Sequence, residues 1–272
     1  MANNQNPKIV VNIKNLSCHY GSTTALEDIN LTLLEREILV IMGHSGSGKS
    51  TLFRSVLGLM PATSGSIEIL GKDISKSTKK DLYHLRKNIG VAFQNGALFS
   101  SMSVRENVEL PLREHTTLDG KTIQIMTMMK LAMMNLTGHE DLMPSQLSGG
   151  MLKRAGLARA VVMDPKLLFF DEPSAGLDPV TSAELDRLIL QLRHALNMSI
   201  VIITHELESA FNIADRITVL DKGKQIMTGT REEVRQSQDK RITNMLARQV
   251  RDEHIDADRY LNDLTGEHEV HK

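Results

Sequence analysis

The segment from Gly43 to Ser50 constrains the fold of this chain more than any other part of the sequence. It reads Gly-His-Ser-Gly-Ser-Gly-Lys-Ser, which fits the pattern G-x-x-x-x-G-K-[ST]. An apolar run over 38–42 precedes it, and an apolar stretch predicted to be a helix, 51–59, follows it. A strand, a glycine-rich loop and a helix in this order can cradle a polyphosphate with backbone N–H groups and the helix N-terminus. The alternative, a glycine-rich turn without a ligand, does not explain the flanking strand and helix.

The loop residues have predicted tasks in binding a magnesium nucleotide. Lys49 bridges the β- and γ-phosphates, and the hydroxyl of Ser50 is a ligand of Mg²⁺. The other residues expected to line the phosphates are Gly43, Ser45, Gly46, Gly48 and Thr51.

A second apolar run, 167–170, ends in two carboxylates, Asp171 and Glu172. At the end of a strand, Asp171 can hold Mg²⁺ directly or through water, and Glu172 can reach the water that attacks the γ-phosphate. Alone, this pattern is equally typical of an ordinary strand end. Together with the phosphate loop, it predicts a hydrolytic magnesium-nucleotide site.

Short β-branched runs alternate with helix-like stretches, which indicates an α/β fold with a largely parallel sheet. The predicted strands are 9–13, 29–33, 38–42, 67–70, 89–93, 167–170, 200–204, 217–220 and 225–228. Helical spacing replaces this alternation from about 96 to 162, which predicts an inserted helical subdomain. The main domain is expected to span 1–248. An acidic tail, 249–272, follows it.

The composition excludes several classes of protein. The chain has 32 Lys and Arg against 33 Asp and Glu, which argues against a nucleic-acid partner held by net positive charge. A single cysteine, Cys18, excludes an internal disulfide and a multi-cysteine zinc site, and suits a reducing compartment. The longest apolar run, 38–42, is far shorter than the ~20 residues of a transmembrane helix, and no secretory signal is visible. We therefore expect a soluble, cytosolic protein.

Further motifs occur in a fixed order along the chain. They are Gln94 after the strand 89–93, Leu147-Ser148-Gly149-Gly150-Met151 at a helix start, Ser174-Ala175-Gly176-Leu177-Asp178, and His205 after the strand 200–204. With the two segments above, this order and spacing resembles the ATP-binding subunits of ABC transporters from about residue 9 to 235. The resemblance implies a P-loop ATPase core with a helical subdomain and small antiparallel β elements, and the cofactors ATP and Mg²⁺.

The resemblance also implies roles within one chain. Tyr20 resembles the aromatic residue that stacks on adenine. Gln94 resembles the loop glutamine that contacts Mg²⁺ and reports to the helical subdomain, so the expected metal ligands are Ser50, Gln94 and Asp171. His205 resembles the histidine that contacts the γ-phosphate, and it joins Glu172 and Gln94 as the expected catalytic residues.

Other residues are implied to act across a homodimer. Ser148, Gly149 and Gly150 would bind the γ-phosphate of ATP held by the other protomer, and Asp178 would connect the two sites. Hydrolysis would then require closure of the dimer. The family usually has Gln where this chain has Met151, which puts the contacts of that glutamine in doubt.

A finer resemblance rests on fewer residues: 93–99, 111–116 and the signature that ends in Met151. These are similar to the ATPases of Mla phospholipid transporters, which belong to the group whose substrate-binding partner carries an MCE domain. The resemblance implies an integral-membrane permease, an MCE-domain protein, a peripheral place on the cytoplasmic face of the inner membrane, and phospholipid transport toward or from the periplasm. The alternatives are another cargo (an amino acid, a metal or lipopolysaccharide) and a soluble ABC-type ATPase.

Two features allow more than one interpretation. Met126, Met129 and Met133 form a helical stripe that either belongs to the subdomain core or forms a groove for a permease helix. The tail 249–272 is either a solvated end or a helix that packs on the other protomer or on a small regulatory subunit.

Overall fold

The computed structural model describes residues 8–21 and 23–247. Within them, ten strands form one sheet in the order β5-β4-β1-β2-β10-β9-β3-β8-β7-β6. The strands are β1 Ile9–Tyr20, β2 Thr23–Leu34, β3 Ile38–Met42, β4 Ser64–Ile69, β5 Lys72–Asp73, β6 Ile89–Ala92, β7 Leu167–Asp171, β8 Ser199–Thr204, β9 Arg216–Asp221 and β10 Lys224–Thr230. The helices are α1 Lys49–Val56, α2 Lys79–Arg86, α3 Val104–His115, α4 Gly120–Met133, α5 Gly149–Val161, α6 Pro179–Leu196, α7 Leu207–Ile213, α8 Arg231–Arg235 and α9 Lys240–Leu246, with a 3₁₀ turn at Pro144–Gln146.

The centre of the sheet is parallel, as the apolar runs predict. Strand β3 pairs with β8 and β9, and β7 pairs with β8 and β6, all in parallel. Every residue of β3 is buried, and successive side chains enter different clusters: Val40 joins the cluster with the helices of the inserted region, and Leu39 joins the one with β1, β2 and α1. Burial on both faces explains why this strand is continuously apolar.

Strands β1 and β2 are longer than predicted. The sequence predicts 9–13 and 29–33, but β1 and β2 each span 12 residues and pair antiparallel. Their burial is irregular along the strand, with several register shifts, which weakens the alternation on which the prediction depends. Strand β5 was not predicted, because two residues carry no periodic signal.

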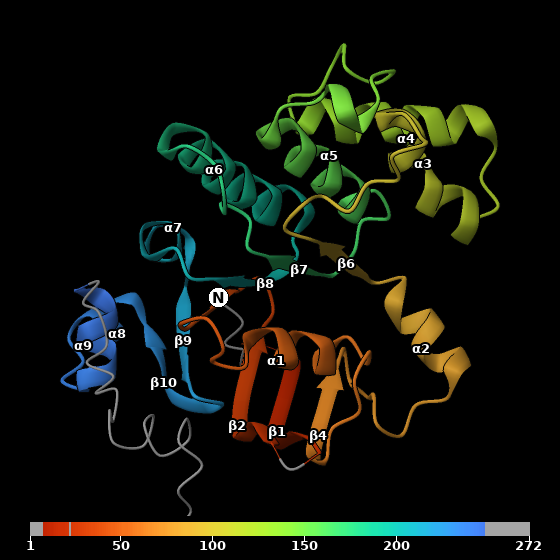
Figure 1. Cartoon of the computed structure of the whole chain (residues 1–272). Coiled ribbons are helices and arrows are strands. Elements are labelled where there is room, and N and C mark those ends of the chain that lie inside the picture. The colour runs from red at the N-terminus through yellow and green to blue at the C-terminus, as the bar shows by residue number, and fades with distance from the viewer. Residues whose placement is uncertain (1–7, 22, 248–272) are drawn as a thin grey trace, which may run out of the picture.

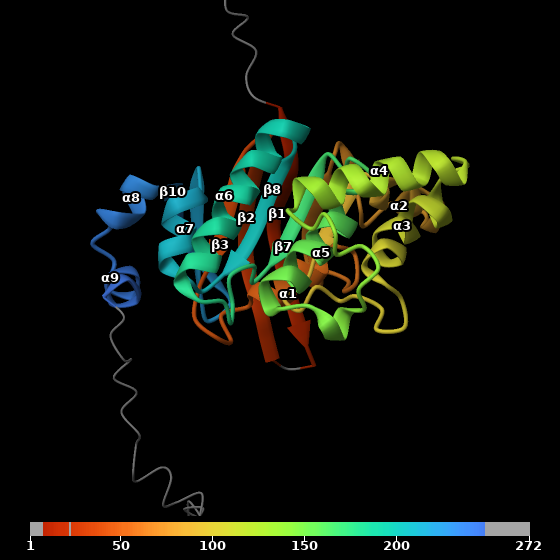
Figure 2. The same cartoon turned by 90° about the horizontal axis from the view of Figure 1, so that it is seen from above.

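The helix after the phosphate loop begins and ends earlier than predicted. It spans Lys49–Val56 instead of 51–59, because Gly48 already supplies the N-cap with φ 101°. After β6, the chain forms α3, α4 and α5 before it returns to the sheet at β7. Figures 1 and 2 show these helices at one end of the molecule and α8 and α9 at the opposite end. Among the described helices, none is both long and apolar enough to cross a membrane. The tail 249–272 lies outside the described residues.

Candidate active site

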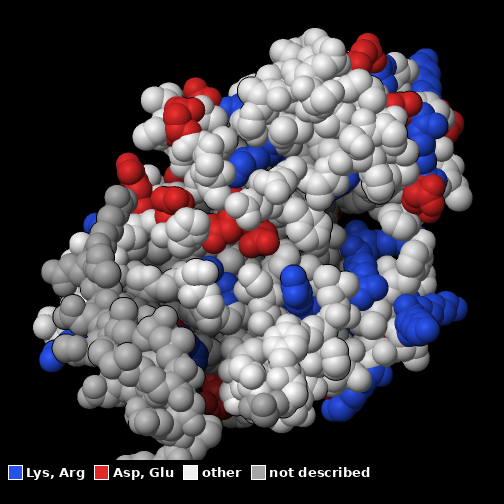
Figure 3. All heavy atoms as spheres, in the orientation of Figure 1, with Lys and Arg blue, Asp and Glu red and all other residues white. Residues whose placement is uncertain are grey.

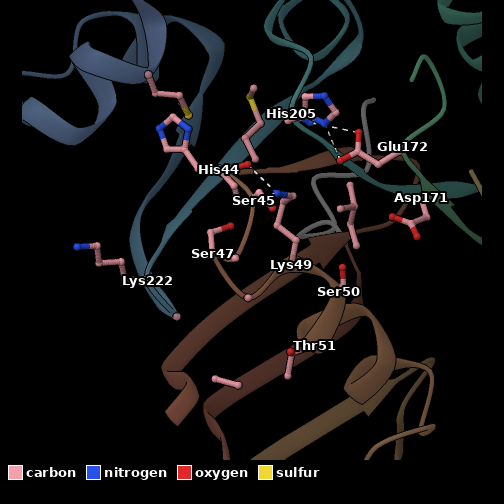
Figure 4. A pocket seen from close by; sticks show the side chains of 18 of the residues that line it. His44, Ser45, Ser47, Lys49, Ser50, Thr51, Asp171, Glu172, His205 and Lys222 are labelled. Atoms are coloured by element: carbon pink, nitrogen blue, oxygen red, sulfur yellow. Dashed lines mark hydrogen bonds and ion pairs between the residues drawn. The ribbon is translucent and has the colours of Figure 1, made fainter. Parts of the chain in front are cut away.

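The phosphate loop lies between the end of β3 and the start of α1, and its lysine is turned inward (Figure 4). The Lys49 ammonium donates to the carbonyl oxygens of Gly43 at 2.6 Å and of His44 at 2.9 Å. Burial lowers the pKa of Lys49, while the carboxylates of Glu172 and Asp171 oppose that shift. The positive charge therefore lies within the loop and faces two carboxylates.

Neighbouring backbone packs tightly against the loop. At Gly48, φ is +101°, and a Cβ there would lie 2.6 Å from Leu26 Cδ2 and 2.9 Å from the Ala25 carbonyl oxygen. Any other residue at position 48 would be strained and would collide with the start of β2. Gly223 in the β9–β10 turn donates its N–H to the carbonyl of Ser47 at 3.1 Å. The loop is thus fixed from two sides, by β2 and by this turn.

The two carboxylates lie at the end of β7, as predicted. Asp171 ends the strand, and burial followed by repulsion from Glu172 raises the pKa of its carboxyl. Glu172 has φ +49°, which is unusual for a residue with a side chain, and its N–H donates to the Ile203 carbonyl at 2.8 Å. This backbone turn directs the Glu172 side chain toward the end of β8.

Glu172 and His205 contact each other directly. His205 Nδ1 lies 2.9 Å from Glu172 Oε1, and the His205 backbone N–H donates to Oε2 at 3.3 Å. His205 Nε2 lies 3.4 Å from Glu206 Oε1. In Figure 4, Glu172 and His205 lie together above Lys49, with Asp171 to one side. The contact fixes the orientation of the carboxylate that the sequence assigns to water activation.

One pocket of about 1160 Å³ gathers most of the predicted site residues. Those that line it are Gly43, Ser45, Gly46, Gly48, Lys49, Ser50, Thr51, Gln94, Asp171, Glu172 and His205. A pocket of this volume is large enough for a nucleotide. The buried Ser47 hydroxyl in the loop has no hydrogen-bond partner among the described residues, so it is available to a ligand. Tyr20 does not line the pocket; it is 50% exposed at the end of β1, and its hydroxyl lies 2.9 Å from Met60 Sδ.

The side chains around the pocket fit Mg²⁺ bound together with a nucleotide. Ser50, Gln94 and Asp171 offer oxygen atoms to the same pocket, and oxygen is the ligand that Mg²⁺ prefers. Within the described part of the chain, no cluster of three or more His, Cys, Asp or Glu could hold a metal without help. Mg²⁺ commonly completes its coordination with phosphate and water, so the sparse donor set is consistent with this metal.

The remaining predicted residues lie apart from this pocket. Ser148 caps α5 by accepting the Met151 N–H at 3.3 Å, and it is exposed together with Gly149. A Cβ at Gly150 would lie 2.9 Å from Thr181 Cγ2, which places this helix start beside the start of α6. The carboxylate of Asp178 caps α6 by accepting the N–H groups of residues 180 and 181, each at 3.0 Å. None of these residues lines the pocket around Lys49.

The nearly neutral total charge is unevenly distributed. Figure 3 shows acidic side chains gathered on the side of α6 and α7 and basic ones on the side of α2. Exposed cations of α2 include Lys79, Lys80 and Arg86. The net charge of the chain therefore does not give the charge of any one face. The expected absence of a nucleic-acid partner stays a prediction.

Comparisons with known proteins identify the family. Residues 26–175 match the ABC transporter family. The chain belongs to this family. The match covers the phosphate loop, the helical region and the carboxylates at the end of β7, so the ABC fold predicted from the sequence is confirmed.

ABC proteins of several kinds are similar to this chain. It is 40% identical to the intermembrane phospholipid transport system ATP-binding protein MlaF of Haemophilus influenzae, over 89% of this chain and 91% of that protein. The MlaF of Escherichia coli is 38% identical, over 87% of this chain and 88% of that protein. A "probable ribonucleotide transport ATP-binding protein" of Mycobacterium bovis is 42% identical, over 82% of this chain and 62% of that protein.

Two solved structures of ABC proteins match most of this chain. The cbiO1 protein of Clostridium perfringens, part of an ABC transporter complex, has a TM-score of 0.78 and 32% identity, over 83% of this chain and 90% of that one. A dimeric ATP-binding cassette in a post-hydrolysis state, bound to ADP and Pi, has a TM-score of 0.74 and 30% identity, over 81% and 98% of the two chains.

The sequence did not reveal every residue of the site. The pocket is also lined by Thr23, Thr24, His44, Lys222 and Met245. Met245 lies in α9, far along the chain from the loop, and Lys222 lies in a turn without a motif of its own. His44 and Ser47, which also lines the pocket, occupy variable positions of the loop pattern and could have been found from it.

Proposed function

We propose that this chain is the ATP-hydrolysing subunit of a transporter that moves phospholipid between the inner membrane and the periplasm or outer membrane. The observation that carries the ATPase part is the convergence of Lys49, Asp171 and the Glu172–His205 pair on one pocket. The cargo is supported by the two MlaF relatives, whose names state phospholipid transport.

The side chains have complementary tasks in hydrolysis. Lys49 and the loop N–H groups bind the β- and γ-phosphates, which requires Lys49 to exchange its carbonyl contacts for phosphate oxygens. Glu172 orients and deprotonates the attacking water, and His205 holds the Glu172 carboxylate and reaches the γ-phosphate. Mg²⁺, held by Ser50, Gln94 and Asp171, would neutralise charge on the phosphate oxygens.

A second copy of the chain would complete the site. Ser148 and Gly150 are on the same chain as Lys49 but do not line its pocket, so they are available to ATP held by another protomer. The relative solved as a dimer with ADP and Pi supports a homodimer for this chain. Asp178 is the N-cap of α6, beside the motif 147–151 at the start of α5. It would therefore lie near the boundary between the two copies.

The membrane partners would be a permease and an MCE-domain protein. The three methionines of the stripe 126, 129 and 133 differ in burial. Met126 and Met133 are partly buried against the core, as the core interpretation expects, whereas Met129 is 61% exposed, as the groove interpretation expects. Met129 is therefore the stripe residue that is available to a permease. A small regulatory subunit and a role for the tail 249–272 stay predictions.

The cargo has one specific alternative. The mycobacterial relative carries a name that states ribonucleotide transport, although this chain spans only 62% of that protein. Purification of the subunit with its membrane partners, followed by mass spectrometry of the bound molecules, separates the two. Enrichment of phospholipid supports the proposal, and enrichment of nucleotides other than ATP and ADP contradicts it.

Hydrolysis is tested with matched variants of the full chain. We expect Glu172→Gln to bind ATP, form a stable ATP-dependent dimer and lose turnover, and Lys49→Ala to lose ATP binding. Glu232→Gln on α8 and Lys80→Ala on α2 change the same residue types at exposed positions and serve as controls. Phosphate release, binding of a fluorescent ATP analogue and sedimentation give the readouts. Wild-type turnover by Glu172→Gln would show that the water-activating carboxylate is misassigned.

A further inference from the structure

Lys153 is a buried lysine for which neither the phosphate site nor the family motifs provide a task. It lies in the second turn of α5 and is only 6% exposed. Its ammonium donates to three carbonyl oxygens: Pro173 at 2.6 Å, Ala175 at 2.6 Å and Glu172 at 3.2 Å. A lysine ammonium has three N–H donors, so these three carbonyls satisfy it completely.

The hydrogen-bond partners of this buried charge are unusual. A buried ammonium is normally paired with a carboxylate, whereas the three hydrogen bonds of Lys153 described above all go to backbone carbonyls. Burial lowers the pKa of Lys153, and the Glu172 carboxylate opposes that shift. Lys130 of α4 shows the ordinary arrangement, since it is 7% exposed and pairs with the Asp164 carboxylate at 2.5 Å.

The three carbonyls belong to the segment that carries the proposed catalytic carboxylate. Glu172 holds its backbone at φ +49°, a conformation that costs about 1 kcal/mol or more for a residue with a side chain and needs support from its surroundings. The convergence of the carbonyls on one cation gives such support. Without the ammonium, three carbonyl dipoles would point at one another in a buried space.

The same helix begins at Ser148, which is proposed to meet ATP of the other protomer. Ser148 and Lys153 are five residues apart, so their Cα atoms are separated by about 7.5 Å along one rigid helix. A shift of α5 that accompanies contact at Ser148 must also move the Lys153 ammonium relative to the Glu172 segment. One helix thus touches both proposed sites.

We propose that Lys153 is a positioning residue that couples α5 to the Glu172 carboxylate, so that contact of Ser148 with one ATP sets the geometry for hydrolysis of the other. This inference rests on the proposed function. Lys153 does not line the pocket, so its effect passes through the backbone of residues 172–175, whose carbonyls it contacts.

The test compares full-length Lys153→Met with Lys130→Met, which removes another buried lysine, and with Lys153→Arg, which keeps donors and charge. We expect Lys153→Met to lower kcat about 10- to 100-fold, the range that a displacement of about 1 Å can produce in a catalytic group. The Kd for a fluorescent ATP analogue should stay within about two-fold of wild type, because phosphate binding does not use Lys153. Lys153→Arg should recover part of kcat.

Hydrogen exchange gives a readout that is independent of turnover. Peptides that cover residues 172–178 should exchange faster in Lys153→Met than in wild type, and Lys130→Met should leave them unchanged. If Lys153→Met does not fold, Lys153→Gln replaces it, with the same expected changes in kcat, Kd and hydrogen exchange.

Three results would overturn the inference: wild-type kcat in Lys153→Met, an equal loss in Lys130→Met, or a parallel loss of kcat and ATP affinity. A wild-type chain that binds ATP without hydrolysing it would instead overturn the proposed function, and this inference with it.

Discussion

Substitution of Gly156 by Ala tests how closely α5 packs on the loop that follows Gln94. A Cβ at position 156 would lie 2.7 Å from Gly96 Cα and 2.8 Å from the Gly96 carbonyl oxygen. Both are backbone atoms, so no rotamer change can relieve the contact. Gly96 itself has φ +69° and lies close to the Leu152 carbonyl, so the loop cannot simply retreat.

The expected magnitude follows from two opposing effects. Alanine in a helix interior is favoured over glycine by about 1 kcal/mol. Overpacking costs about 1–3 kcal/mol, and a collision with two backbone atoms belongs at the upper end of that range. The net change is a destabilisation of about 2 kcal/mol, which lowers Tm by about 4–8 °C for a domain of this size.

Gly120→Ala is the matched control, because Gly120 begins α4 and a Cβ there would meet nothing within 4 Å. We expect it to raise the free energy of unfolding by up to about 1 kcal/mol. Differential scanning calorimetry compares the two variants with wild type. A Tm for Gly156→Ala that equals or exceeds that of Gly120→Ala would refute the packing argument.

Three further predictions concern other parts of the molecule. Burial raises the pKa of the Asp186 carboxyl above its ordinary value of 3.8, so the contribution of this carboxyl to stability is present at low pH and is lost as the pH rises through the native pKa. The Tm of Asp186→Asn relative to that of wild type should therefore rise between about pH 4 and pH 8. A Tm difference that stays constant over this range would contradict the prediction. Asn107 is fully buried and makes four hydrogen bonds, two of them to the Phe99 backbone; Asn107→Leu should lower the free energy of unfolding by about 2–4 kcal/mol in denaturant titration, and a loss below 1 kcal/mol would count against it. Met129→Asp should reduce co-purification with the permease while ATP binding and Tm stay unchanged, and undiminished co-purification would exclude Met129 from that interface.

The parts of the fold that sequence predicted best are those where local pattern and burial agree. Strand β3 was predicted at its observed bounds because all five residues are apolar and both faces are covered. The phosphate loop was found because its chemistry requires particular residues at fixed spacing. Strands β1 and β2 were underestimated, since their polar residues face solvent along an antiparallel layer and interrupt the pattern.

Contacts between distant segments could not be predicted from the same patterns. The sequence indicated that Glu172 and His205 belong to one site, but not that His205 Nδ1 would lie 2.9 Å from the carboxylate. Lys153 carried no signal at all, because its partners are backbone carbonyls, which any residue can supply. Only the fold brings these carbonyls to one point.

Helix α5 contacts the segments that follow two neighbouring strands of the sheet. Through Lys153 it holds the segment after β7, and Arg159 donates to the Gly96 carbonyl at 3.0 Å, in the loop after β6 that also carries Gln94. Burial lowers the pKa of Arg159. Arg159 is therefore, like Lys153, a desolvated cation that donates to a backbone carbonyl. Because one helix is attached to both loops, a displacement of α5 must move Gln94 and Glu172 together. A membrane partner that pushes on the helical region would therefore alter a proposed metal ligand and the proposed water-activating carboxylate in one step.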